Sequence, residues 1–206
     1  MEYTLQQTKE KLGFNMSDTT VWNGLEQQWK DAFGTTVLGH TNTPDALEVE
    51  RLFSSKVVRM AGPRAPYPNM TFELTNLSGI KHFHDLEILV VTHHQIRNIK
   101  PLRALTKLKS LFLFNNEIES LEGIEELAEL EQLYVQSNKI SSLKPLQKLT
   151  RLKEAYVNNN LITSLEGLTE AHADTLEVFF CKPNEALKQK EIIYAENQLG
   201  IKCRSI

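Results

Sequence analysis

The stretch that decides the fold is Leu108–Ile118, LKSLFLFNNEI, which returns 22 residues later as LEQLYVQSNKI over Leu130–Ile140. Further copies of this segment begin at Leu86, Leu152 and Leu176, the last after an insertion of two residues. Self-similarity at a short fixed period indicates a stack of small units, each covering the apolar face of its neighbour. The sequence therefore predicts a solenoid.

Each position of the unit carries its own structural signal, with the first leucine numbered one. Apolar residues at positions four and six have the period of two that indicates a strand with one buried face. Successive strands then pair in parallel, and the rest of each unit supplies the crossover. Pro101 and Pro145 alternate there with Gly123 and Gly167, which favours extended or short 3₁₀ structure over a regular helix. Position nine holds a polar side chain predicted to bond neighbouring turns: His94, Asn116, Asn138, Asn160 and Asn184.

This pattern resembles the leucine-rich repeat, in the short form found in bacterial internalins and in eukaryotic phosphatase-regulating homologues. The resemblance covers roughly residues 71–185. It implies an α/β solenoid shaped as a right-handed horseshoe, with a parallel concave sheet and an extended or 3₁₀ convex side. It also implies a bacterial protein that binds other proteins, commonly with the concave face.

The ends of the chain are predicted to cap the solenoid, whose terminal units would otherwise expose apolar edges. Residues 1–70 form a helical N-terminal cap and linker, residues 71–183 the repeats, and residues 184–206 a C-terminal capping helix and edge strand. A second cap helix is indicated by Thr43 as its N-cap and Pro44 at its first position. An edge strand over 56–60 and a proline-rich linker over 62–68 follow. The first cap helix rests on apolar spacing before a glycine stop: Trp22, Leu25, Trp29, Phe33 and Gly34.

The C-terminal cap is predicted to contain a helix over 184–197 and a final edge strand. Cys203 falls one repeat period after Cys181, so Ile201 matches position four and Cys203 is predicted to pack beside Cys181. Two interpretations stay open for this pair, namely two buried reduced thiols or a disulfide between neighbouring strands.

Charged residues alternate in sign between units. Position two reads Glu87, Lys109, Glu131, Lys153 and Glu177, and position fifteen reads Lys100, Glu122, Lys144 and Glu166. Stacking places opposite charges side by side, so a slip by one unit would bring like charges together. We expect these columns to define the register of the stack.

Composition and motifs exclude several classes of function. The net charge of −3 does not favour nucleic-acid binding, and no apolar run is long enough to span a membrane. Without a secretory signal at Met1–Leu5, the chain is expected to be cytoplasmic if it is full length, and exported if it is a trimmed piece. No phosphate-binding loop or zinc motif is present, so we expect no enzyme, cofactor or metal. The histidine pairs His82/His84 and His93/His94 lie at opposite edges of the predicted sheet.

Outward-pointing strand positions are the best candidates for a site. Position five is aromatic in four of five units, and large rigid aromatic side chains are favoured interface anchors. The alternative is that stacked rings only stabilise the sheet. We expect a protein or peptide partner on the concave face; the competing hypothesis is a regulatory or inhibitory subunit that contacts its enzyme through the caps. Self-association is a further possibility. The predicted contact residues are Phe112, Phe114, Tyr134, Gln136, Tyr156, Asn158 and Phe180.

Overall fold

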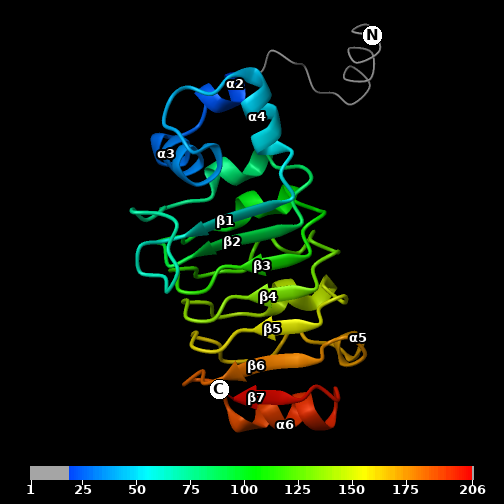
Figure 1. Cartoon of the computed structure of the whole chain (residues 1–206). Helices are drawn as coiled ribbons and strands as arrows, with labels where there is room; N and C mark the ends of the chain where they lie inside the picture. The colour runs from blue at the N-terminus through cyan, green and yellow to red at the C-terminus, as the bar shows by residue number, and fades with distance from the viewer. Residues whose placement is uncertain (1–18, 206) are drawn as a thin grey trace, which may run out of the picture.

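Parallel strands stack in the order of the sequence to form one sheet (Figure 1). The computed structural model describes residues 19–205, and within them the sheet has seven strands. The helical cap lies beside β1, and the last helix lies beside β7 at the other end (Figure 1). The strands are β1 Val57–Ala61, β2 Ile88–Thr92, β3 Ser110–Phe112, β4 Gln132–Tyr134, β5 Glu154–Tyr156, β6 Val178–Lys182 and β7 Cys203–Ser205.

The repeat period determines the register of the strands. Leu89 pairs with Leu111, and Leu111 with Leu133, so each residue lies beside its equivalent in the next unit. Residues at positions four and six are buried in one continuous apolar core, and each buried leucine side chain contributes about 1.5–3 kcal/mol of transfer free energy. The predicted solenoid with a parallel sheet is confirmed.

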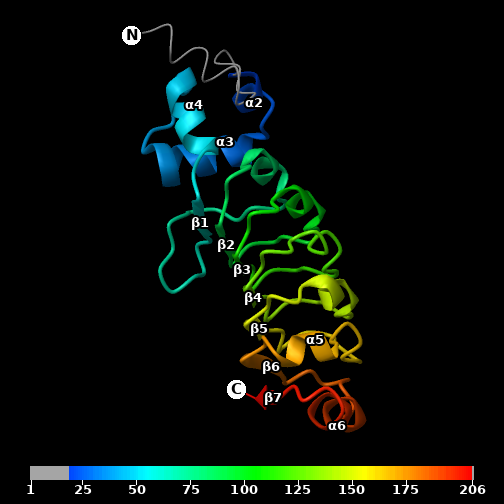
Figure 2. The same ribbon diagram turned by 90° about the vertical axis from the view of Figure 1, so that its right-hand side faces the viewer.

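The return segments lie on the side of the solenoid opposite the strands (Figure 2). Units with proline form 3₁₀ helices, η3 Lys100–Ala104 and η4 Lys144–Lys148, and the half unit before them forms η2 Ser78–His82. Gly123 and Gly167 instead adopt φ values of 112° and 114°. A Cβ atom on Gly167 would lie 2.1 Å from the Leu143 carbonyl oxygen, so the glycine units approach the preceding proline units closely. The lengthened unit carries α5 Glu170–Ala173.

Position nine forms a buried hydrogen-bond ladder, as predicted. Asn116 Oδ1 accepts from the Ile96 N–H at 3.2 Å, and its Nδ2 donates to the carbonyls of Val91 at 2.8 Å and Leu113 at 3.0 Å. The asparagines of the following units repeat these contacts. The ladder satisfies backbone groups that parallel strands and turns leave without partners.

The predicted charge columns are also confirmed. At position two, Glu87 accepts ion pairs from Lys56 and Lys109, both at 2.8 Å, and these cations lower the pKa of Glu87 to about 2. At position fifteen, the Lys100–Glu122 and Lys144–Glu166 pairs are 3.0 and 3.1 Å long. These exposed pairs add little stability individually, but they disfavour a slipped register.

The N-terminal cap consists of α2 Thr19–Asn23, α3 Gln27–Phe33, the π-helix η1 Gly34–Leu38 and α4 Ala46–Phe53. Its core includes both tryptophans, Trp22 and Trp29, which are 5% and 0% exposed. Trp29 lies on Gly79 of the first half unit, where a Cβ atom would come within 2.3 Å of the indole. Because Gly79 has no side chain, Trp29 of the N-terminal cap can pack directly on the first half unit.

Two predictions about this cap were wrong, and a third was right only in part. The first helix is interrupted after Asn23. The next helix, α3, ends at Phe33 with Gly34 as its C-cap, but the chain continues as the π-helix η1 as far as Leu38, before Gly39 with a φ of 76°. The second helix begins at Ala46 rather than Pro44, because Asp45 forms a reciprocal capping box with Glu48, with both bonds at 2.9 Å. Thr43 therefore has no capping role.

The C-terminal cap differs from the prediction in two ways. Its helix, α6 Gln189–Asn197, is shorter than expected, and Phe179 pairs with Cys203 rather than with Ile201; the predicted final edge strand (β7) and the contact between Cys203 and Cys181 are confirmed. The register shifts because the Ile201 N–H donates to the Ala195 carbonyl at 2.9 Å, which ties Ile201 to α6 instead of to the sheet. Both cysteines are free and buried, and a contact between their thiols raises the pKa of Cys181. No helix among residues 19–205 is long and apolar enough to cross a membrane.

Candidate partner-binding face

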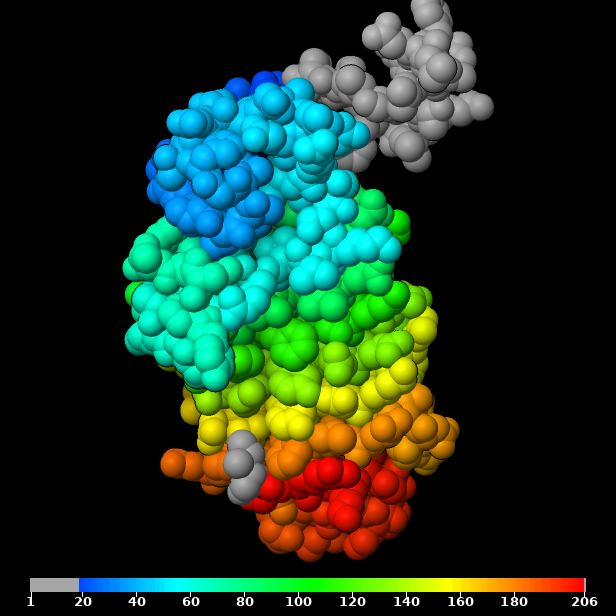
Figure 3. All heavy atoms as spheres, in the orientation of Figure 1, coloured from blue at the N-terminus to red at the C-terminus, as the bar shows by residue number. Residues whose placement is uncertain are grey.

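The sheet has one face that does not pack on the core, which we call the open face (the predicted concave face). It consists of the residues at positions three, five and seven of each strand, and Figure 3 looks onto it. Because side chains alternate along a strand, these residues point away from the buried positions four and six. The open face is therefore the place to look for the predicted contacts.

Position five forms a continuous row of stacked rings, which we call the aromatic column: Phe112, Tyr134, Tyr156 and Phe180. The centroids of Tyr134 and Tyr156 are 4.4 Å apart at an interplanar angle of 16°, and those of Tyr156 and Phe180 are 4.7 Å apart at 17°. Phe112 and Tyr134 lie 4.7 Å apart at 33°. All four side chains are partly exposed, so the predicted column exists and reaches solvent.

The stacking hides ring faces and exposes ring edges. Tyr134 and Tyr156 each have a neighbouring ring on both sides, so their faces are covered. The Tyr134 hydroxyl donates to Glu154 Oε2 at position three of the next strand. Burial and this carboxylate raise the pKa of Tyr134 far above its usual value. The column thus presents ring edges and a neutral phenol to a partner.

Position seven matches the prediction only in part. Phe114 is partly exposed and meets His93 edge to face, with centroids 5.5 Å apart. Gln136 is partly exposed, but Asn158 is fully buried, which differs from the expected exposed contact. Within residues 19–205, Gln136 Oε1 and both amide atoms of Asn158 have no hydrogen-bond partner.

Sequence reasoning missed two residues that prolong the aromatic column. Arg59 of β1 pairs with Val90 at position five, and Arg204 of β7 pairs with Phe180. The alternation of buried Val58 and Met60 around Arg59 was a signal that could have placed it in this column. Arg204 could not be placed, because the register shift of β7 depends on contacts with α6.

The loop after β1 forms a rim beside the open face. It extends beyond the strands on the side away from the 3₁₀ helices (Figure 2), and it appears in teal in Figure 3. Arg59 Nη2 donates to the Tyr67 carbonyl, and Asn69 bonds the β1 backbone at Ala61 N (2.6 Å) and Arg59 O (2.8 Å). These bonds hold the loop in place and leave the Tyr67 side chain 82% exposed.

The histidine pairs do not converge on a metal site. His94 belongs to the position-nine ladder, accepting from the Leu74 N–H at 3.1 Å and bonding the Met60 carbonyl at 3.2 Å. His93 Nε2 accepts from Asn115 Nδ2 at 2.9 Å, and His82 packs on the Phe53 ring. Within residues 19–205, no three His, Cys, Asp or Glu side chains are grouped to hold a metal ion. An open cleft of about 480 Å³ beside the pair is lined by Arg64, His93, His94, Asn115, Asn116, Glu117 and Ser137.

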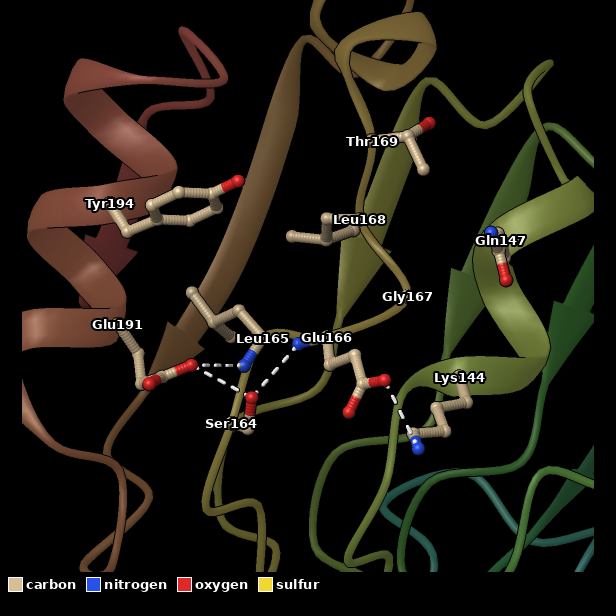
Figure 4. A pocket seen from close by; sticks show the side chains of 10 residues that line it. All are labelled: Lys144, Gln147, Ser164, Leu165, Glu166, Gly167, Leu168, Thr169, Glu191 and Tyr194. Carbon is tan, nitrogen blue, oxygen red and sulfur yellow. Dashed lines mark hydrogen bonds and ion pairs between the residues drawn. The ribbon is translucent and has the colours of Figure 1, made fainter.

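A second cleft, of about 310 Å³, lies between α6 and the last return segments (Figure 4). Its polar groups mostly bond one another: Glu191 accepts from Ser164 Oγ at 2.7 Å, and Lys144 pairs with Glu166 at 3.1 Å. Tyr194 extends from α6 toward Leu168 across the cleft (Figure 4). This arrangement is that of a joint between the cap and the repeats, and the open face remains the better candidate site.

A comparison with family models finds leucine-rich repeats in the middle of the chain. A family model described as Leucine Rich repeats (2 copies) matches residues 106–148 and 128–170. This match shows that residues 106–170 consist of leucine-rich repeats, and the parallel sheet continues on both sides of them with strands of the same kind. Proteins with such repeats generally mediate protein–protein interactions. A comparison with curated protein sequences gives no match.

Two solved structures of internalins from Listeria monocytogenes are similar to the chain. The internalin InlF is 22% identical with a TM-score of 0.49, over 57% of this chain and 38% of its own length. Internalin C2 is 14% identical with a TM-score of 0.40, over 79% of this chain and 91% of its own length. The match thus spans less than half of the first of these proteins.

Proposed function

We propose that the chain is a non-enzymatic interaction module that binds a protein or peptide partner on the open face. The observation that carries this proposal is the aromatic column, a contiguous row of partly exposed rings on the face of the sheet that faces away from the core. Exposed apolar patches of this kind are unusual on monomers, and Tyr and Phe are favoured anchors of interfaces.

The competing interpretation, that the rings only stabilise the sheet, accounts for less of the structure. Each stacked pair contributes about 0.5–1.5 kcal/mol beyond area burial. The register is already specified by the Asn ladder and by the alternating columns of Lys and Glu, so aromatic residues are not needed for it. A row of rings retained at the solvent boundary supports a binding role.

Site-specific photo-crosslinking tests the location of the binding site. A benzophenone amino acid replaces Phe112 or Tyr156 on the open face, Leu47 on α4, or Tyr194 on α6; all four side chains reach solvent. The labelled proteins are irradiated in native lysate, and adducts are identified by mass spectrometry. Any captured protein is then purified and titrated against the unmodified chain.

The expected result is a common adduct from the two open-face positions and none from Tyr194, with saturable binding of the purified protein. Adducts confined to Leu47 or Tyr194 would overturn the proposal and favour a regulatory subunit that acts through its caps. An adduct of the chain with itself would indicate self-association, which sedimentation at two concentrations would then quantify.

A further inference from the structure

The charged residues within the seven strands of the described chain are mostly cations. Arg59, Lys182 and Arg204 are opposed by a single carboxylate, Glu154, which already accepts a hydrogen bond from the Tyr134 hydroxyl. None of the three cations forms an ion pair with another residue of 19–205, although the chain as a whole has a net charge of −3. Among residues 19–205, the strands of the open face therefore carry a net positive charge.

The two arginines have donors available for a partner. Arg59 donates to the Tyr67 carbonyl and Arg204 to the Glu177 carbonyl at 3.0 Å, so each contacts a neutral acceptor rather than a carboxylate. Arg204 Nε is buried without a partner in the described structure. An arginine fork is well suited to bidentate recognition of a carboxylate. By contrast, the cations in the edge columns are paired with glutamates.

The arginines lie at opposite ends of the aromatic column. The position-five row runs from Arg59 in β1 through Val90 and the four rings to Arg204 in β7. Six steps between neighbouring strands, at about 4.8 Å each, place the two backbones about 29 Å apart. An extended polypeptide at about 3.3 Å per residue covers this distance with about nine residues.

The stacking of the rings favours negatively charged partners over positively charged ones. Ring faces carry the negative part of the aromatic quadrupole and ring edges the positive part. Because the faces of Tyr134 and Tyr156 cover their neighbours, they are closed to cation–π contacts with a basic partner and to stacking with nucleic-acid bases. The exposed edges suit carbonyl and carboxylate oxygens as well as apolar side chains.

We propose that the partner presents an extended acidic segment of about nine residues, which crosses the strands along the aromatic column. Carboxylates near its two ends pair with Arg59 and Arg204, and apolar side chains between them cover the ring edges. This inference rests on the proposed function and adds the chemistry of the partner and the direction in which it lies.

An unbiased peptide selection tests this chemistry. A library of random nine-residue peptides is displayed and selected on the chain, and the enriched peptides are synthesised with a fluorescent label for anisotropy titrations. The variant Arg59→Gln/Arg204→Gln removes both end charges. The matched control Arg103→Gln/Lys148→Gln removes two exposed charges from η3 and η4 on the opposite side. Circular dichroism establishes that both variants are folded.

The expected peptides carry Asp or Glu near both ends and apolar residues in the middle. Their affinity falls at least roughly tenfold in the arginine variant, stays within about twofold in the control, and weakens as NaCl rises from about 0.05 to 0.5 M. Selection of neutral or basic peptides, no enrichment, or equal affinity for the arginine variant would overturn the inference. Displacement of the peptide by a thymidine oligonucleotide would also overturn it, in favour of a nucleic acid.

The two proposals fail in different ways. If Phe112 and Tyr156 still crosslink a protein while no acidic peptide is selected, the open face is a binding site and only the acidic character of its partner is wrong. If neither experiment gives a signal from this face, both proposals fail together.

Discussion

His94 occupies a position that asparagine holds in the other units, and its replacement by asparagine makes a sharp test of the ladder. Its contacts with Leu74 N and Met60 O correspond to those that Asn116 makes with Ile96 N and Val91 O. Because a backbone N–H donates to Nδ1, the imidazole is neutral and its Nε2 carries the proton. Protonation of Nδ1 would break the bond to Leu74.

The size of the expected change in the free energy of unfolding follows from the pKa of His94. Burial lowers the pKa of His94 from 6.5 to about 4, and the side chain is 1% exposed. Below pH 6.5 the unfolded chain takes up a proton that the folded protein does not accept until about pH 4. The neutral His94 therefore contributes stability that is fully present above pH 6.5 and is lost as the pH falls to 4. At about 1.4 kcal/mol per pKa unit, the loss is about 3 kcal/mol.

Urea unfolding of the wild type and of His94→Asn, at pH 7 and pH 4.5, measures this effect. The wild type should lose about 2–3 kcal/mol more than the variant between the two pH values. Other groups with lowered pKa values, such as His172, titrate in both proteins and cancel in the difference. Equal losses in the two proteins would refute the argument that His94 is a neutral member of the ladder.

Three further predictions concern the ladder, the cap and the aromatic column. Asn138→Ala removes three buried hydrogen bonds and should lower the free energy of unfolding by about 3 kcal/mol in urea titrations, whereas the exposed Ser141→Ala should change it little. Gly79→Ala should displace Trp29, which shifts tryptophan fluorescence to the red and costs about 1–3 kcal/mol; unchanged emission would contradict the seating of the cap. Because burial and a neighbouring carboxylate raise the pKa of Tyr134, absorbance titrations of the wild type and Tyr134→Phe should coincide up to about pH 11.

The repeats were predictable because their information is local and periodic. One period fixes which residues lie side by side, so the strands, the buried columns, the ladder and the charge pairs all follow from the 22-residue spacing. The caps are not built from repeats, so no equivalent residues in other units indicate their structure. The start of α4 was decided by the competition between Thr43 and Asp45 for one helix terminus, and Asp45 prevailed because Glu48 completes its capping box.

The central part of the candidate site, the aromatic column, could be predicted from the sequence, but the residues at its two ends could not. The four rings of the aromatic column follow from the repeat, whereas Arg204 depends on a register set by the bond between Ile201 and Ala195. Asn158 is buried although strand alternation places position seven on the open face, so alternation alone does not predict its burial. The rim near Tyr67 is held by hydrogen bonds from the side chains of Arg59 and Asn69. These residues do not recur with the repeat, so the sequence pattern does not predict the rim.

The alternation of glycine and proline in the return segments has a consequence for how this chain can grow or shrink. Gly79, Pro101, Gly123, Pro145 and Gly167 occupy the same position in successive units, and the charges at position two alternate with them. Excising a single glycine unit would join two proline units and set glutamate against glutamate, and excising a single proline unit would join two glycine units and set lysine against lysine. Excising two would restore both matches. Deletions and duplications that keep the stack matched, in evolution or in engineering, are therefore expected to involve two repeats at a time.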